Sequence, residues 1–594
     1  MKIGVAFGDH IKVEKNRKNH SGGEYKQRIR VHIFFLALVL FPLIIILKLL
    51  DIQLIHGSYY RLISESNRTK TNTLFPQRGA IFDRQGNLLV INSPSIEKEI
   101  NEFSNNSNFD QNDKEIKTNA NRYYPFKETM AHVLGYIGKL TKEELSEPEY
   151  SYLHPNDSVG KSGIEKYYDN LLRGTYGKEL VEVDALGNTL RTLGSSDPIP
   201  GQNIHLTLDK DIQKASFNAF PKGKKGAVIV SNTKGEILAL VSMPSFDPNL
   251  FTMGDNYKSV SGDYKSILAV LSDDSNQPFM DRAISGVYPP GSTFKLVTAA
   301  AGLEKKIIDK NYIVEDTGVI RIGEFSFGNW YFLEQGKKDG QVDIVKAISR
   351  SNDIFFYKLA EKISVDKLSE VAHDFGVGSK LEIDLPNEAS GLLPTKEWKS
   401  RVIKEPWYLG DTFHYGIGQG FLLTTPMQVN SWTGVIANQG LKVRPHLLKE
   451  SESIQANTAN VKDRDKKERI ISESAIDLIR RGMIDSCKPG GVAWPLFNFR
   501  VENSELRIDG KNFLAVKNAT GAAVRADLRE VSIACKTGTA QHGGEETLPH
   551  AWITLFAPAY NPQIVVTVLI ESAGQGSNEA GPVAKKVLET WFKK

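Results

Sequence analysis

The chain has 594 residues, of which 40% are apolar and 24% are charged. This composition is that of a globular protein, and the length predicts more than one domain. The formal net charge of +4 is too small to call for a nucleic-acid partner, and we expect none. The two cysteines, Cys487 and Cys535, are too few for a disulfide framework. A disulfide between them is possible, although their spacing does not support it.

Residues 31–54 are predicted to be a membrane anchor. Val31 to Leu50 reads VHIFFLALVLFPLIIILKLL, which is long and apolar enough to cross a bilayer as a helix. Residues 1–30 hold eight Lys and Arg against three acidic residues, so the positive-inside rule predicts a cytoplasmic basic tail and a chain that continues outside. A cleaved signal peptide would have a shorter apolar core and a small-residue cleavage site, and the sequence after Leu50 offers none.

Beyond the anchor, the sequence predicts two domains, at residues 55–200 and 201–594, divided by the turn-rich DPIPGQN segment. The first contains RGAIFDRQGNLLVI, which is typical of a hairpin, and an Asn-rich connection at residues 101–121. Near the start of the second, GAVIVSNTKGEILALVSMP predicts two strands around a turn at residues 232–235.

The stretch YPPGSTFK places Ser292 and Lys295 three residues apart, where an apolar helix-like run begins. A helix starting near Gly291 would put both side chains on one face. Ser292 would then lie beside free backbone N–H groups that can stabilise an oxyanion, and a neutral Lys295 could take its proton. The pattern Ser-x-x-Lys occurs five times in the chain, so it identifies no site by itself.

Two further elements support Ser292. Lys536, Thr537, Gly538 and Thr539 form the only Lys-Thr-Gly in the chain, in a strand-like segment where a substrate could pair along the edge and have its carboxylate bound. Ser351 begins a Ser-Asn-Asp element 59 residues after Ser292, and its hydroxyl could relay a proton between the two lysines. A helix cap explains that element equally well.

Together the three elements, in this order, resemble the penicillin-binding enzymes. The likeness extends to RGAIFDRQGNLL, RYYPFKETMAHVLGYIG, GIEKYYDNLLRGTYG, DRAISGVYPPGSTFK, YGIGQGFLLTTPMQ and HAWITLFAP, which are similar to landmarks of the class B penicillin-binding proteins. The resemblance implies an α+β multidomain chain. It would have a single transmembrane helix, a mixed α/β pedestal of the dimerisation type, and a transpeptidase domain with a central antiparallel sheet flanked by helices.

The resemblance also implies roles and partners. Ser292 would be the acylated nucleophile, Lys295 its general base and Ser351 the proton relay, while Lys536, Thr537, Gly538 and Thr539 would bind a carboxylate and polarise the site. The N–H groups of Ser292 and Thr539 would form the oxyanion hole. Asp353, where Asn is commoner, would contact the substrate and resembles the elongation-type branch called penicillin-binding protein 2.

We therefore expect a peptidoglycan D,D-transpeptidase of the bacterial inner membrane that cross-links stem peptides during elongation and binds β-lactams. A polytopic, RodA-like glycosyltransferase is the expected protein partner. A membrane-anchored β-lactamase, a β-lactam sensor and a non-catalytic scaffold are the alternatives. We expect no metal and no cofactor, and we interpret His542, His550, Cys535 and Trp330 as structural residues.

Overall fold

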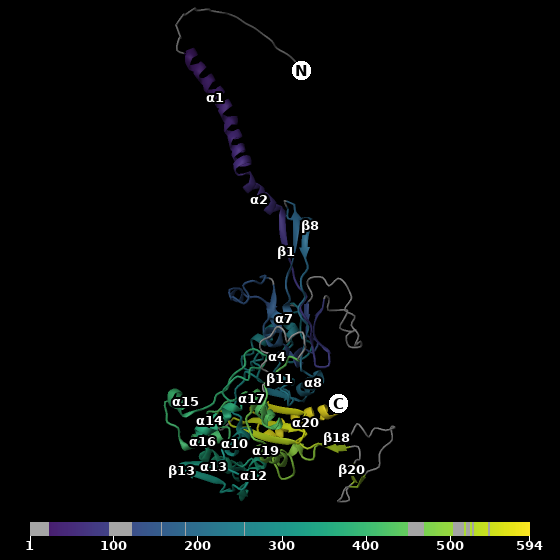
Figure 1. The fold of residues 1–594 in the computed structure, drawn as a ribbon, viewed down its shortest axis with the longest axis vertical. Helices are drawn as coiled ribbons and strands as arrows, with labels where there is room; N and C mark the ends of the chain where they lie inside the picture. The colour runs from purple at the N-terminus through teal and green to yellow at the C-terminus, as the bar shows by residue number, and fades with distance from the viewer. Residues whose placement is uncertain are drawn as a thin grey trace, which may run out of the picture. The chain divides into compact units, whose positions relative to one another are not determined.

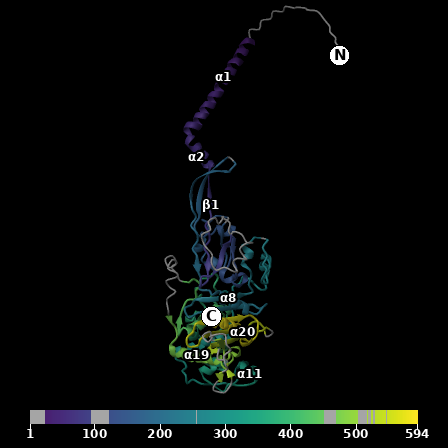
Figure 2. The same ribbon diagram turned by 90° about the vertical axis from the view of Figure 1, so that its right-hand side faces the viewer.

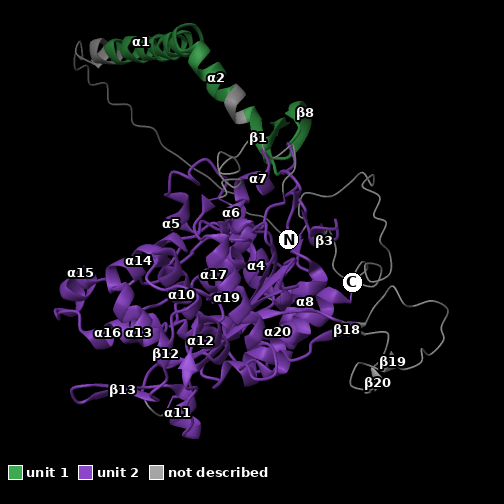
Figure 3. Ribbon diagram, turned by 60° about the horizontal axis from the view of Figure 1, so that its bottom comes forward, with its two compact units in different colours: residues 1–75, 176–198 green, residues 76–175, 199–594 purple. Residues whose placement is uncertain are grey.

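The computed structural model describes most of the chain. The described residues are 23–93, 121–155, 157–184, 186–254, 256–449, 468–502, 516–517, 523–524, 528–544 and 547–593. The predicted basic tail lies outside them up to residue 22, as does the Asn-rich connection up to residue 120. The chain divides into two compact units, which Figure 3 shows in green and purple.

The smaller unit contains residues 1–75 and 176–198. Its apolar helix α1 (Gly23–Leu50) continues through a π-helical turn (Asp51–Ile55) toward α2 (Gly57–Arg68), as Figures 1 and 2 show. Residues 28–55 are long and apolar enough to cross a membrane, and the apolar side chains of α1 are exposed. An antiparallel sheet follows, with the strand order β1 (Thr69–Leu74), β7 (Gly177–Val183) and β8 (Thr189–Ser196).

In the larger unit, residues 76–175 form a mixed α/β region around a buried cluster of charges. The predicted hairpin is confirmed as the antiparallel pair β2 (Ile81–Phe82) and β3 (Leu88–Ser93), flanked by β4 (Asn121–Tyr123) and β9 (Ile204–His205). The fully buried Glu165 accepts hydrogen bonds from Arg78 and Arg122, both at 2.7 Å. Such a buried carboxylate is tolerated because both cations satisfy it.

A five-stranded antiparallel sheet forms the centre of the larger unit. Its strand order is β11 (Ile237–Met243), β10 (Gly226–Ser231), β24 (Ile564–Ile570), β23 (His550–Ala557) and β22 (Ala534–Ala540). The predicted hairpin around residues 232–235 is confirmed as β10 and β11. Because β22 pairs only with β23 among the described strands, it is the edge of this sheet.

Helices cover both faces of the sheet, so its strands are apolar almost throughout. On one face, α8 (Lys210–Ala219) and α20 (Gly576–Phe592) share an apolar core with Ile553, Leu555 and Val566. On the other, α10 (Lys295–Glu304), α17 (Pro426–Ala437) and α19 (Glu473–Ser486) pack with Trp552 and Phe556. Figure 1 shows α20 beside the yellow strands. The predicted antiparallel sheet flanked by helices is therefore confirmed.

Three further features position the residues of the site. Helices α12 (Ile344–Arg350) and α13 (Asp353–Ile363) follow each other almost without a break. A segment ahead of them contains β12 (Val314–Glu315), β13 (Val319–Ile322), β14 (Phe325–Gly328), α11 (Trp330–Gln335) and β15 (Gln341–Val342). Cys487, at the end of α19, forms a disulfide with Cys535 on β22, with 6.0 Å between the Cα atoms. The sequence did not decide whether this disulfide forms, and it is present in the structure.

Candidate active site

The loop before Ser292 is held in place by contacts from three other segments. Gly291 has a φ of +53°, and a Cβ built there would lie 2.9 Å from the Thr539 carbonyl oxygen. The Gly291 N–H donates to Gly418 O at 2.8 Å, and the Trp552 indole donates to Pro289 O at 3.1 Å. Glycine is therefore needed at position 291 both for its backbone conformation and for the close approach of β22.

Ser292 lies in a 3-10 turn, Gly291–Thr293, and α10 begins three residues later at Lys295. The predicted helix start is thus confirmed, with a tighter first turn. Ser292 is half-buried, whereas Lys295 is fully buried. Among the turn and loop hydrogen bonds of the described backbone, the N–H groups of Gly291 and Phe294 are paired, and none uses the Ser292 N–H.

The Lys295 ammonium group contacts the Ser-Asn-Asp element. Its Nζ donates to Asp353 Oδ1 at 2.7 Å, to Ser351 O at 2.8 Å and to Ser351 Oγ at 3.3 Å. Three acceptors match the three donors of a protonated lysine. Asp353 was predicted to contact the substrate. The structure instead places its carboxylate against Lys295 and the Trp330 N–H, and a substrate contact stays a prediction.

Lys536 reaches the same serine from the opposite side. Its fully buried Nζ donates to Ser351 Oγ at 2.8 Å and to Thr537 O at 2.8 Å. The Ser351 hydroxyl therefore bridges the two lysines, which lie on α10 and β22. This bridge joins the three elements that the sequence singled out separately.

Burial and charge act on both lysines. Burial lowers the pKa of Lys295, and the neighbouring Asp353 carboxylate opposes this by raising that pKa. Burial also holds the pKa of Lys536 well below its ordinary value, and the charge of Lys295 lowers it further. Two buried amines with lowered pKa values that share one serine hydroxyl can therefore exchange a proton through it.

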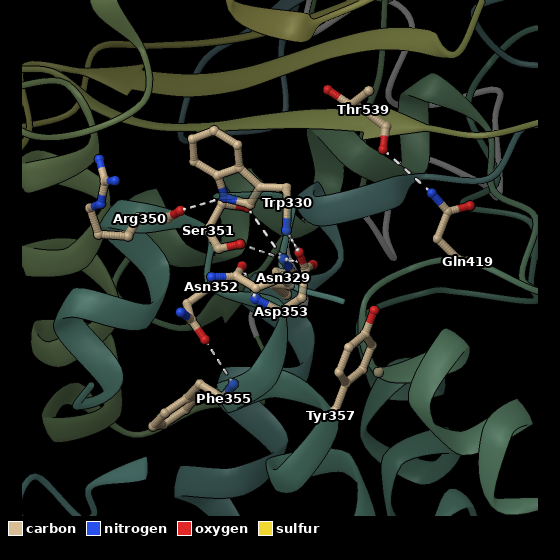
Figure 4. A network of polar contacts seen from close by, with 12 residues as sticks. Asn329, Trp330, Arg350, Ser351, Asn352, Asp353, Phe355, Tyr357, Gln419 and Thr539 are labelled. Carbon is tan, nitrogen blue, oxygen red and sulfur yellow. Dashed lines mark hydrogen bonds and ion pairs between the residues drawn. The ribbon is translucent and has the colours of Figure 1, made fainter. Parts of the chain in front are cut away.

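The junction between α12 and α13 contains the helix cap that one interpretation of Ser-Asn-Asp predicted, while the proton relay stays a prediction. Ser351 ends α12 in the left-handed region, with a φ of +55°. Asn352 caps α13, since its Oδ1 accepts the Phe355 N–H at 2.9 Å. Figure 4 shows the two side chains next to each other at this junction. The cap sets the backbone, and the serine beside it faces the lysines.

The strand β22 supplies the remaining predicted residues. Thr537 is nearly buried and Thr539 is exposed. The Gln419 amide donates to Thr539 O at 3.4 Å, a contact seen in Figure 4. A Cβ at Gly538 would meet Thr293 Cγ2 at 3.0 Å and Pro290 O at 3.2 Å, so a side chain here would press on the nucleophile loop. Ligand contacts of these residues remain predictions.

Sequence reasoning missed Asn329 and Asp316. The Asn329 side chain accepts the Asp353 N–H at 3.1 Å and donates to Asp316 at 2.9 Å, and both residues are buried. The next residue, Trp330, donates its backbone N–H to Asp353 at 3.0 Å and its indole N–H to Arg350 O. The only signal was a polar residue within FGNWYF, where apolar neighbours would predict burial.

Two histidines, His542 and His550, lie close to β22 in the chain. His542 and His550 stack in parallel, with 3.7 Å between the ring centroids. Burial and the charge of His542 lower the pKa of His550 to about 4, so this imidazole is neutral at physiological pH. Among the described residues, no group of three His, Cys, Asp or Glu side chains is placed to hold a metal ion.

The Ser351 hydroxyl joins Lys295, three residues after Ser292, to Lys536 on the edge strand of the sheet. This set of a serine and two buried lysines is that of a serine-type acyltransferase. Residues 225–589 match the family model described as the penicillin-binding protein transpeptidase domain, and residues 99–206 match the penicillin-binding protein dimerisation domain. The chain therefore belongs to the penicillin-binding protein transpeptidases.

Relatives and solved structures agree with this assignment. The peptidoglycan D,D-transpeptidase MrdA of Haemophilus influenzae is 31% identical over 95% of this chain and 91% of its own. The structure of Pseudomonas aeruginosa PBP2 in complex with WCK 5153 is 32% identical, covers 88% of this chain and 97% of its own, and has a TM-score of 0.67. The complex between Helicobacter pylori PBP2 and MreC is 27% identical, covers 88% and 99%, and has a TM-score of 0.68.

Proposed function

We propose that this chain is a membrane-anchored peptidoglycan D,D-transpeptidase of the elongation type, with Ser292 as its nucleophile. The observation that carries the site is the Ser351 hydroxyl, which lies within 3.3 Å of Lys295 Nζ and 2.8 Å of Lys536 Nζ. A relative of nearly the same length is named for this activity.

In the acylation step, Ser292 Oγ attacks the carbonyl carbon of the D-Ala-D-Ala peptide bond in a stem peptide. The neutral Lys295 amine takes the hydroxyl proton, and the carbonyl oxygen becomes an oxyanion facing the Ser292 and Thr539 N–H groups. Collapse of this intermediate breaks the C–N bond. The departing D-alanine amine receives a proton through Ser351, which both lysines contact.

In the second step, an amine from a neighbouring strand attacks the acyl-enzyme and releases Ser292 with the cross-linked product. Lys536, Thr537 and Thr539 bind the terminal carboxylate of the donor peptide, and the edge of β22 pairs with its backbone. A β-lactam carries a carboxylate and a strained amide in a similar arrangement, so it acylates the same serine.

The apolar helix and the basic tail support a location in the bacterial inner membrane, with the N-terminus in the cytoplasm and the catalytic domain outside. The expected partners are a RodA-like glycosyltransferase and, since a solved relative is in complex with MreC, an MreC-like protein.

The test is intact-mass spectrometry of the full chain in detergent, mixed with a penicillin and followed over time, with peptide mapping of the adduct. We expect one long-lived adduct on Ser292 that is absent in Ser292→Ala. Rapid loss of the adduct with accumulation of hydrolysed drug would instead identify a β-lactamase. A folded chain that forms no adduct would favour the scaffold.

A further inference from the structure

Behind the site, a buried polar cluster ties the segment ahead of α12 to the Ser351–Asp353 junction. Asp316, 2% exposed, lies at its centre, directly after β12. Its carboxylate accepts the backbone N–H groups of Gly318 at 2.8 Å and Asp339 at 2.9 Å. It also accepts the side-chain amides of Asn329 at 2.9 Å and Asn352 at 3.0 Å. Four N–H donors thus hold one carboxylate in place.

Asn329 connects the Asp316 carboxylate to Asp353. Its Oδ1 accepts the Asp353 N–H at 3.1 Å, while the following residue, Trp330, donates its N–H to Asp353 Oδ2 at 3.0 Å. The other carboxylate oxygen, Oδ1, is therefore left facing Lys295 Nζ at 2.7 Å. Figure 4 shows Asn329, Trp330 and Asp353 converging at the start of α13.

We propose that Asp316 and Asn329 are positioning residues that fix the Asp353 carboxylate on Lys295 and the Ser351 hydroxyl between the two lysines. Neither residue contacts the reacting atoms, so each acts through Asp353 and the Asn352 cap. This inference rests on the proposed function, because it assigns a role in the acylation of Ser292.

The charged groups around the affected atoms are few. Within the described residues, Lys295 faces Asp353 from α13 and Lys536 from β22. Beside Asp316, the Asp339 carboxylate accepts from the same Asn352 amide at 3.1 Å and pairs with Arg350 at 3.1 Å. A change at Asn329 removes no charge, so any effect on the pH dependence must come from a shift of Asp353 against Lys295.

The decisive variant is Asn329→Ala, which removes the acceptor for the Asp353 N–H and one donor to Asp316. We expect the acylation rate of Ser292 by a fluorescent penicillin to fall about 10- to 100-fold, as for a misplaced catalytic group. In the pH–rate profile, the acid limb is the part in which the acylation rate falls as the pH falls. This limb should move to lower pH, because a displaced Asp353 carboxylate no longer raises the pKa of Lys295. The matched control is Asn311→Ala, an exposed asparagine three residues before β12.

A double-mutant cycle separates positioning from general destabilisation. In an Asp353→Asn background, Asn329→Ala should not move the acid limb further, because no carboxylate is left to position. An acid limb that Asn329→Ala leaves unmoved in a folded protein would overturn the proposal, and so would an equal displacement in both backgrounds. Wild-type protein without any Ser292 adduct would instead refute the proposed function.

Should Asn329→Ala fail to fold, Asn329→Ser loses the same two contacts and leaves a small polar group. The expected result is the same, with circular dichroism as the check of folding. If this variant also failed to fold, Asn329 would be needed for the fold as a whole and the specific positioning role would be wrong.

Discussion

Replacing Asp353 by Asn tests how the site controls the charge of its general base. Asparagine has the same shape, so it can still accept a hydrogen bond from the Trp330 N–H or from Lys295. What disappears is a negative charge 2.7 Å from Lys295 Nζ. That charge raises the pKa of Lys295 against the lowering effect of burial. The substitution therefore leaves only the lowering effect.

The size and the sign of the effect follow from this distance. Two unit charges 2.7 Å apart attract by about 6 kcal/mol at an effective dielectric constant of about 20, before the cost of desolvation. Acylation needs the neutral Lys295 amine, so its rate falls as the pH falls through the pKa of that group. Because loss of the carboxylate lowers this pKa, the acid limb should move to lower pH, by about 1 to 3 pH units.

The assay is the rate of acylation by a fluorescent penicillin, measured over the pH range in which the protein stays folded. Asp366→Asn is the control, since it removes a carboxylate that is 61% exposed on α14 (Val365–Asp374) and pairs with Lys396. This control should leave the limb in place, because exposed ion pairs are weak. If the acid limb in Asp353→Asn stayed in place or moved to higher pH, Lys295 would not be the titrating base.

Two further predictions concern the surroundings of the nucleophile. Replacing Cys487 and Cys535 by Ala should lower the free energy of unfolding by about 4 kcal/mol, which is the chain-entropy value for a cross-link over 48 residues. Urea denaturation measures this change. Two alkylatable thiols in the native protein would contradict the disulfide on which the prediction rests. Gly291→Ala should slow acylation about tenfold or more, because the Cβ would meet Thr539 O and displace the loop that holds Ser292. Gly323→Ala is the control, since Gly323 also has a positive φ, +58°, but no atom lies within 4 Å of the added Cβ. This control should lower the free energy of unfolding by about 1 kcal/mol and leave the acylation rate unchanged. An equal loss of acylation rate in both variants would refute the steric argument.

Local patterns in the sequence predicted the features that depend on neighbouring residues. The apolar run of α1, the hairpin of β10 and β11, and the helix start at Lys295 each follow from spacing within about ten residues. The three chemical elements were also found, because each is a short motif. Their meeting at Ser351 could only be expected from the resemblance, since no local rule brings Lys536 to a serine 185 residues earlier.

The sequence could not give the contacts that depend on long-range packing. Asp353 appeared as a substrate contact because its partner, Lys295, is 58 residues away and the ion pair exists only once α10 packs beside α13. Asn329 gave only the weak signal of an amide among apolar residues, and Asp316 gave none, because their partners lie in segments that only the fold brings together. The disulfide required Cys487 at the end of α19 to meet β22, which neither spacing nor composition indicates.

The backbone at Ser351 explains why these distant contacts are needed. A non-glycine residue at a φ of +55° costs on the order of 1 kcal/mol or more, so the junction would relax unless other contacts held it. The Asn352 N–H donates to Ala347 O at 2.9 Å, which closes α12, while the Asn352 side chain opens α13. Glycine would remove the strain but also the hydroxyl. Any residue would supply the carbonyl that accepts from Lys295, so the need for serine at this left-handed position comes from the hydroxyl, which both lysines contact.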